Sequence, residues 1–299
     1  MRVLLTGSTG QLGYEIINSK PNGIEIYHPT RMELDLSDYE YCEKFVLEKR
    51  PDWIINTGAY TLVDKAERER DLAKNVNSFA PWAFVKAINK IDCNLLQLST
   101  DFVFDGKQNK PYQESQATCP INYYGYTKAL GEELIEKEIN DKSRATILRT
   151  SWVISPRGKN FVKTILNAHK VKENINVVSD QVGVSTSAKE LAKVCWKIIE
   201  LKKTKKLPFI IHWSDAGVSN WYNLALEVGV IGVELGLLKK QANVNAISSE
   251  EYETSAKRPK YSLLSISKSI DLLEIKPKCW KENLKEILID YKKINTKRN

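Results

Sequence analysis

Short apolar runs of strand length recur along the first half of the chain, and segments with helical spacing separate them. The runs cover residues 3–6, 24–27, 53–56, 94–98 and 145–148. Strands that alternate with helices form parallel sheets, and helices then cover both faces of the sheet. The pattern therefore predicts an α/β fold with a doubly wound parallel sheet.

Two helix starts and one helix end can be located from side-chain chemistry. The pattern Ser-x-x-Glu occurs at Ser37 and at Ser187. In this capping box the two side chains accept hydrogen bonds from backbone N–H groups at a helix start. We therefore expect helices to begin after Ser37 and after Ser187. The first should end before Pro51, because proline disfavours helical geometry at the residue that precedes it.

Composition narrows the class of protein. Of the 299 residues, 42% are apolar or aromatic, enough to bury a sizeable core and to exclude disorder as the working state. The net charge of +8 is scattered along the chain, so no nucleic-acid partner is expected. The longest apolar stretch, residues 224–238, contains two glutamates, and no signal peptide opens the chain, so no membrane partner is expected either. Five widely spaced cysteines favour a reducing, cytoplasmic location.

The first strand leads into a glycine turn, Gly7-Ser8-Thr9-Gly10-Gln11-Leu12-Gly13, which opens a helix. Glycines let the backbone approach a diphosphate closely, and the helix N-terminus offers free N–H groups and the positive end of its dipole. A Gly-x-x-Gly-x-x-Gly turn after the first strand indicates a dinucleotide site of the Rossmann type. We assign Gly7, Gly10, Gln11, Leu12 and Gly13 to cofactor binding.

The alternation of strands and helices weakens after about residue 150. We therefore expect an NAD(P)-binding Rossmann domain over residues 1–150, with contributions from some later strand and helix. Residues 151–299 should form mainly a smaller, C-terminal substrate-binding region.

The residues after the second strand bear on the choice of cofactor. An NAD site usually presents a carboxylate at the end of this strand, to hold the ribose 2′-hydroxyl. Here Arg31 follows the strand and no acid stands at its end. An arginine suits a 2′-phosphate, so the sequence favours NADPH. NADH remains an alternative, with Arg31 as a surface charge and Glu25 as the ribose partner.

A tyrosine and a lysine stand four residues apart, at Tyr124 and Lys128, where a long helical pattern begins. That spacing puts both side chains on one helix face. A neighbouring ammonium favours the phenolate and brings tyrosine into the range of acid–base catalysis. Thr100, with Asp101 beside it, ends the fourth strand, and its hydroxyl can hold a carbonyl oxygen against the tyrosine. We assign Thr100, Tyr124 and Lys128 to catalysis, and Asp101 to substrate binding.

Longer motifs occur in a fixed order at residues 6–13, 34–36, 56–67, 99–106, 124–132, 148–153, 180–183 and 258–259. Together they resemble the dTDP-4-dehydrorhamnose reductase family of the extended short-chain dehydrogenase/reductase superfamily. The resemblance implies reduction of the C4 ketone of dTDP-4-dehydro-6-deoxy-L-mannose to dTDP-L-rhamnose, for cell-surface polysaccharide. It places further residues at the adenine end (Asp35, Leu36), along the cofactor (Thr57, Gly58, Ala59) and at the sugar (Thr61, Val63, Trp152). Separately, the guanidinium of Arg258 could pair with the substrate diphosphate through two hydrogen bonds, or be a surface charge.

Two residues depart from the family pattern. Phe102 replaces the tyrosine usual after Ser-Thr-Asp, and Gly58 stands where alanine is common. The lost hydroxyl leaves the identity of the sugar open, because one hydroxyl near a ligand can shift preference by about 1–3 kcal/mol.

Several alternatives stay open from the sequence. The chain could reduce a different 4-keto-6-deoxy sugar nucleotide, act as an epimerase or dehydratase, or serve as a non-catalytic NADP-binding regulatory subunit. Some family members need Mg²⁺ for assembly, but scattered carboxylates such as Glu190 justify no metal site. The oligomeric state, including a homodimer, is not fixed by the sequence.

Overall fold

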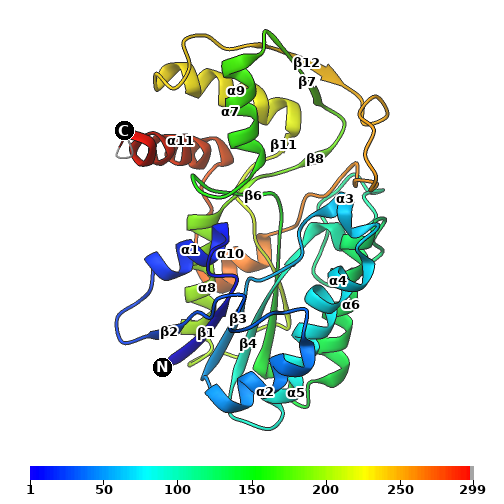
Figure 1. Cartoon of the computed structure of the whole chain (residues 1–299), viewed down its shortest axis with the longest axis vertical. Coiled ribbons are helices and arrows are strands. Elements are labelled where there is room, and N and C mark those ends of the chain that lie inside the picture. The colour runs from blue at the N-terminus through cyan, green and yellow to red at the C-terminus, as the bar shows by residue number, and fades with distance from the viewer. Residues whose placement is uncertain (297–299) are drawn as a thin grey trace.

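The body of the protein is one six-stranded sheet in which every neighbouring pair of strands is parallel. The computed structural model describes residues 1–296. In spatial order the strands are β10 (Ile210–His212), β5 (Ala145–Thr150), β4 (Asn94–Thr100), β3 (Trp53–Asn56), β1 (Arg2–Thr6) and β2 (Glu25–Tyr27). The predicted α/β class with a parallel sheet is confirmed (Figure 1).

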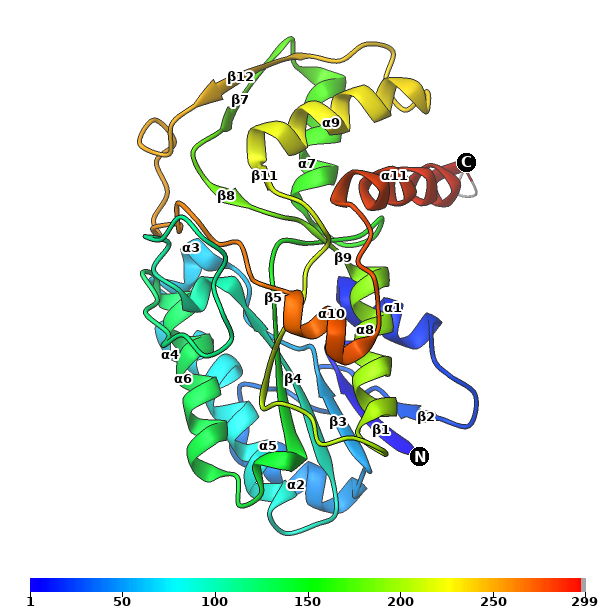
Figure 2. The same cartoon turned by 180° about the vertical axis from the view of Figure 1, so that it is seen from behind.

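Helices cover both faces of this sheet (Figures 1 and 2). One face carries α1 (Gln11–Asn18), α8 (Ala188–Leu201) and α10 (Ser267–Leu273), and the other carries α2 (Tyr39–Lys49), α5 (Ala80–Ile88) and α6 (Tyr123–Glu138). The strand residues alternate between the two cores. Val3 and Leu5 pack under α1 and α8, while Leu4 packs under α2 and α5. Burial on both faces explains why the strands are continuous apolar runs.

The strand order places a crevice at one edge of the sheet. The chain goes from β1 outward to β2, then returns to the other side of β1 to form β3 and β4. Ligands of open α/β sheets bind where the order reverses, outside the carboxyl ends of the strands. Gly7 follows β1 and Thr57 follows β3, so both lie at this point.

The predicted helix boundaries are mostly correct. Ser187 caps α8 and accepts a hydrogen bond from the Glu190 N–H, and α2 ends at Lys49, before Pro51. The cap of α2 was predicted one residue too early. Asp38 caps this helix by accepting from the Tyr41 N–H, because the Ser37 hydroxyl instead donates to Asp35 at 2.8 Å.

A second core forms beyond the carboxyl edge of the sheet (Figure 2). It joins α7 (Phe161–Val171), α9 (Trp221–Glu234) and α11 (Trp280–Thr296). Three short strand pairs accompany them: β6 (Val153–Ile154) with β9 (Thr186–Ser187), β8 (Val182–Gly183) with β11 (Ser219–Asn220), and β7 (Asn174–Val178) with β12 (Asn243–Ile247). Three later elements, α8, β10 and α10, belong to the sheet body.

Short helical segments connect the larger elements. They are α3 (Val63–Ala66), α4 (Arg70–Lys74), a π-helical turn (Asn75–Phe79) and 3₁₀ turns at Asp101–Val103 and Lys142–Arg144. None of the helices within residues 1–296 combines the length and apolar character needed to cross a membrane.

Candidate active site

The glycine turn after β1 is packed too closely for larger residues. Gly7 has a φ of +68°, and a Cβ there would lie 2.6 Å from the Gly58 nitrogen. A Cβ at Gly13 would lie 2.2 Å from the Gly7 carbonyl oxygen. No side chain among residues 1–296 caps the first turn of α1, and that turn holds no acidic residue. Its N–H groups are therefore available to a diphosphate, as the dinucleotide site requires.

The residues predicted for the adenine end lie together beyond β2. Arg31 donates to Asp35 at 3.2 Å, and both side chains are exposed. Leu36 packs against Gly58, where its Cδ1 would lie 2.5 Å from an added Cβ. Leu36 thus occupies the space that an alanine methyl at residue 58 would need, and its side chain would have to rotate to admit one.

Helix α6 brings the tyrosine and the lysine to the carboxyl edge of β4. Asn122 caps the helix by accepting from the Gly125 N–H at 2.8 Å. Tyr124 lies beside Thr100, the last residue of β4. The buried Lys128 donates from Nζ to the Leu98 carbonyl oxygen at 2.6 Å. The structure therefore brings the three predicted catalytic side chains together.

Gly125 sets the distance between α6 and the turn after β4. A Cβ at this position would lie 2.1 Å from the Phe102 carbonyl oxygen, a backbone atom that cannot rotate away. We expect Gly125→Ala to lower the free energy of unfolding by about 1–3 kcal/mol through overpacking. Urea denaturation would measure this loss, and activity should fall with it because Tyr124 moves. Glu133→Ala, on the solvent side of α6, is the control, and an equal loss in both variants would contradict the packing argument.

Burial controls the ionisation of the catalytic groups. It raises the pKa of Tyr124 to about 12, and Asp101 adds to this while the hydrogen bond to Thr100 opposes it. The expected lowering of the tyrosine pKa by Lys128 is therefore wrong for this structure, because desolvation of the phenol dominates. Tyr124 holds its proton at neutral pH, as a proton donor must. Burial also lowers the pKa of Lys128 to about 8, against the opposing effect of Glu132.

Asp101 lies beneath the site and does not face it. Its side chain is buried and accepts a hydrogen bond from the Thr100 hydroxyl at 2.9 Å. Burial raises its pKa to about 6, and its Oδ2 has no hydrogen-bond partner within residues 1–296. Asp101 can orient Thr100, but it does not line the substrate cavity predicted for it.

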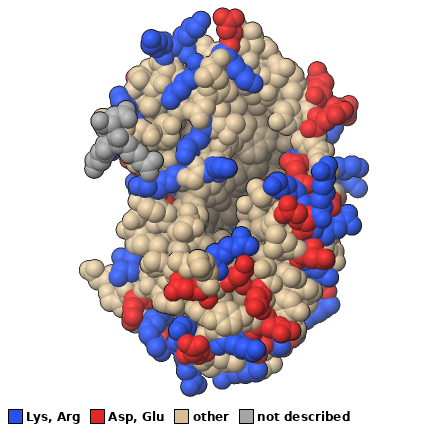
Figure 3. Space-filling model, viewed as in Figure 1, with Lys and Arg blue, Asp and Glu red and all other residues tan. Residues whose placement is uncertain are grey.

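A cavity of about 650 Å³ opens between the sheet body and the second core. Three of the residues predicted for substrate, Val63, Trp152 and Arg258, line it, and so does Phe102, whose ring packs against Tyr124. Thr61, Thr100 and Asp101 lie outside its lining, as do Tyr124 and Lys128. Figure 3 shows the molecule hollowed between its two parts, with both basic and acidic side chains around the hollow. The charged residues that line the cavity are Asp64, Glu253 and Arg258.

Trp152 is held in an unusual backbone conformation. Its φ is +43°, which is rare for a bulky residue. Its ring stacks on Trp221, with centroids 3.6 Å apart and planes 13° apart, and the Trp221 Nε1 donates to Gln181. Gly183 leaves room for the Trp152 ring, which would lie 2.8 Å from a Cβ there. Trp221 and Gln181 also line the cavity, and no sequence motif had indicated Trp221.

Arg258 reaches the cavity but is already paired. Its Nη1 donates to Asp64 Oδ1 at 2.7 Å, and Nη2 forms a second, shorter contact with Oδ2. The guanidinium lowers the pKa of Asp64. The predicted bond to a diphosphate thus requires Arg258 to exchange Asp64 for the ligand.

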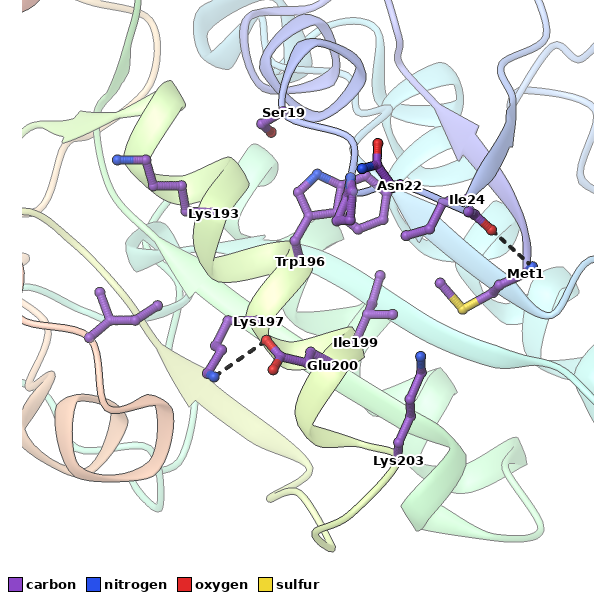
Figure 4. Close-up of a pocket in the computed structure, with 13 residues that line it drawn as sticks. Met1, Ser19, Asn22, Ile24, Lys193, Trp196, Lys197, Ile199, Glu200 and Lys203 are labelled. Atoms are coloured by element: carbon purple, nitrogen blue, oxygen red, sulfur yellow. Dashed lines mark hydrogen bonds and ion pairs between the residues drawn. The ribbon is translucent and has the colours of Figure 1, made fainter.

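Another cavity, of about 550 Å³, lies at the opposite end of the sheet body. Figure 4 shows Met1 and Ile24 on one side of it and Trp196 of α8 on the other. Met1 stands before β1, whereas Gly7 follows that strand. This cavity is therefore remote from the catalytic groups. No group of three or more His, Cys, Asp or Glu side chains suited to a metal ion occurs within residues 1–296.

The fold and the site together define a nucleotide-dependent oxidoreductase of the short-chain dehydrogenase type. A family model described as the RmlD substrate binding domain matches residues 1–293. The chain is 34% identical over 297 residues to the dTDP-4-dehydrorhamnose reductase of Escherichia coli, with 96% of this chain and 97% of that protein covered. It is 35% identical over 288 residues to the spore coat polysaccharide biosynthesis protein SpsK of Bacillus subtilis, with 96% of each covered.

A solved structure agrees with these matches. The dTDP-4-dehydrorhamnose reductase of Bacillus anthracis, in complex with NADP, superimposes with a TM-score of 0.86 at 33% identity, covering 97% of this chain and 99% of the other. This chain belongs to the dTDP-4-dehydrorhamnose reductase family, as its motifs predicted.

Proposed function

We propose that this protein reduces the C4 ketone of dTDP-4-dehydrorhamnose to dTDP-L-rhamnose with NADPH, as a step in cell-surface polysaccharide synthesis. One observation carries the proposal: Tyr124 lies beside Thr100 and shares a helix with Lys128, at the edge of the sheet where the glycine turn lies. The relatives named as dTDP-4-dehydrorhamnose reductases support the substrate, and the relative that binds NADP supports the cofactor.

The residues around the glycine turn fit the cofactor. Gly7 and Gly13 stand where any Cβ would collide with backbone, and the uncapped start of α1 offers N–H donors to a diphosphate. Thr57, Gly58 and Ala59 would border the cofactor from the end of β3. When bound, NADPH supplies the hydride for the reduction.

Side chains of this protein can bind the ketone oxygen and supply its proton. Tyr124 is protonated at neutral pH, so its hydroxyl can give a proton to the oxygen as the oxygen becomes an alkoxide. Thr100 can turn its hydroxyl from Asp101 to that oxygen and hold it in place. Lys128 lies on the same helix face as Tyr124, and its ammonium can donate to the ribose of the cofactor.

The direct test is NADPH absorbance at 340 nm in the presence of a panel of keto-sugar nucleotides. We expect rapid oxidation with dTDP-4-dehydrorhamnose, and slower oxidation with substrates that carry another base or another sugar configuration. Faster turnover of a different 4-keto-6-deoxy sugar would reassign the substrate and keep the reaction. NADPH binding without turnover of any substrate would favour the regulatory-subunit alternative.

Cofactor choice depends on Arg31. When a 2′-phosphate binds, Arg31 can exchange its exposed contact with Asp35 for a charge-assisted bond to the phosphate. We expect Arg31→Ala to raise the Kd for NADPH about tenfold while leaving the Kd for NADH nearly unchanged. Lys44→Ala removes an exposed cation from α2 and is the control. Equal losses for both cofactors would remove Arg31 from the 2′-phosphate site.

The cytoplasm is the location that we propose for this reaction. All five cysteines are free thiols, which suits a reducing compartment. A homodimer stays a prediction, which light scattering of the purified protein would check.

A further inference from the structure

A buried polar cluster lies directly behind Lys128. It consists of Ser99, Glu132, Arg149 and His212, all buried. Arg149 binds Glu132 in a forked arrangement, with Nε at 3.0 Å from Oε1 and Nη2 at 2.5 Å from Oε2. The Ser99 hydroxyl makes a short bond to Oε1, and His212 Nε2 lies 3.4 Å from Arg149 Nη1. Both oxygens of the Glu132 carboxylate therefore accept hydrogen bonds from side chains on the strands of the sheet.

Strand register assembles this cluster in one row. Ser99 on β4 stands beside Arg149 on β5, and Arg149 stands beside His212 on β10. Glu132 comes from α6, one helical turn after Lys128 and two turns after Tyr124. The carbonyl that receives Lys128 belongs to Leu98, the residue before Ser99. The carboxyl end of β4 thus binds both residues: the Leu98 carbonyl accepts from Lys128, and the Ser99 hydroxyl donates to Glu132.

Stability alone does not explain a buried ion pair. Removing both charges from water costs about as much free energy as their attraction returns. Apolar side chains of similar size often stabilise the fold equally well. The location of the cluster points to a second role, because it joins the catalytic helix to the three strands that end at the site. It also places the Glu132 carboxylate one helical turn from the buried Lys128 ammonium, on the same helix face.

The charged and titratable groups around Lys128 come from four elements. On α6 they are Tyr124 and Glu132, after β4 there is Asp101, on β5 there is Arg149, and on β10 there is His212. Burial and Arg149 lower the pKa of His212 to about 3, so this ring is neutral. Glu132 is the group whose charge favours the ammonium of Lys128 against burial.

We propose that Glu132, fixed by Arg149 and Ser99, is a positioning residue that keeps Lys128 in its ammonium form and holds α6 in register with β4 for the reaction. This inference rests on the proposed function of Lys128. Without the carboxylate, the buried amine would lose its proton closer to neutral pH, and both the tyrosine and the cofactor ribose would lose a charged partner.

Glu132→Gln tests this directly and preserves the shape of the site. The amide oxygen can still accept from Arg149, while the amide N–H₂ donates to Ser99, whose hydroxyl can accept. In the wild type, kcat/KM should fall above pH about 8, where Lys128 loses its proton. In E132Q the pH at which kcat/KM falls should be lower by about one unit. The Kd for NADPH should rise as Lys128 loses its proton, so in E132Q this rise should also begin at the lower pH. Glu133→Gln makes the same change on the exposed side of α6 and should leave both profiles unchanged.

A double variant separates the loss of the carboxylate from the effect of an unpaired arginine. Glu132→Gln with Arg149→Met lacks the carboxylate and also the buried guanidinium that E132Q leaves unpaired, so the alkaline limb of the kcat/KM profile should stay at the lower pH of E132Q. An E132Q protein that is folded and active, with its alkaline limb at the wild-type pH, would overturn the inference and leave the proposed function standing. A double variant whose limb returns to the wild-type pH would also overturn it, because the shift in E132Q would then come from Arg149.

A third measurement needs no activity. The folded pKa of Lys128 lies below its ordinary value, so the unfolded chain binds more protons between pH about 8 and 10.5. The difference in unfolding free energy between wild type and Lys128→Met should therefore rise with pH across this window. In the E132Q background the rise should begin at lower pH, and an unchanged onset would contradict the inference. Absence of turnover with every keto-sugar nucleotide would defeat only the proposed function.

Discussion

Tyr124→Phe is expected to lower kcat by about 10²–10⁴-fold, because it removes the proton that the ketone oxygen needs. The phenol is protonated at neutral pH and lies beside Thr100. The ring should keep its place, since it packs edge-on against Phe102 with centroids 5.9 Å apart. The Kd for NADPH should therefore change little.

A neighbouring tyrosine on α6 provides the control for this variant. Tyr126→Phe alters a partly exposed tyrosine two residues further along α6 and should leave kcat unchanged. Steady-state rates and cofactor titrations of the two variants give the comparison. A Tyr124→Phe enzyme with undiminished turnover would remove Tyr124 from the chemistry.

Arg149→Met is expected to lower the free energy of unfolding by about 3–5 kcal/mol, because it leaves the buried Glu132 carboxylate without its ion-pair partner. The loss should show as a lower midpoint in urea denaturation. Adding Glu132→Gln should recover most of it, since the uncompensated charge is then gone. This recovery distinguishes a charge effect from a cavity effect, which the second substitution would not repair.

An exposed pair on the same helix supplies the control for Arg149. Lys137→Met breaks the contact between Lys137 and Glu133, whose side chains are 70% and 54% exposed. Such pairs contribute less than about 1 kcal/mol. If the Lys137 variant lost as much stability as the Arg149 variant, the buried ion pair would contribute no more to the free energy of unfolding than an exposed pair does.

The sheet and the glycine turn could be predicted because their signals are local. An apolar run predicts a buried strand by itself, and three glycines at fixed spacing specify a turn by their backbone freedom alone. The Tyr124–Lys128 spacing likewise depends only on helix geometry. Its position beside Thr100 was predicted from the rule that the carboxyl ends of parallel strands meet at one edge.

The ionisation of the site could not be predicted in the same way. The sequence shows that Lys128 can lie near Tyr124, but it does not show how deeply either group is buried. Burial reversed the expected effect, because the cost of removing a phenolate from water exceeds the attraction of a nearby ammonium.

Contacts between distant segments of the chain could not be predicted from the sequence either. Arg258 meets Asp64 across 194 residues of sequence, and Trp152 stacks on Trp221 in the second core. Neither pairing follows from periodicity or from a motif, since each depends on how the later segments pack on the sheet body. The cap at Asp38 was missed for a smaller reason: Ser37 and Asp38 are both good caps, and Asp35 engages the serine.

The most direct test of the account follows the hydride itself. Purified protein is mixed with dTDP-4-dehydrorhamnose and NADPH that carries deuterium at the transferred position, and the product is examined by NMR and mass spectrometry. The account predicts one deuterium at C4 of a 6-deoxyhexose, formed at a rate that Tyr124→Phe reduces by orders of magnitude. Product without deuterium at C4, or unchanged substrate beside unchanged NADPH, would contradict it.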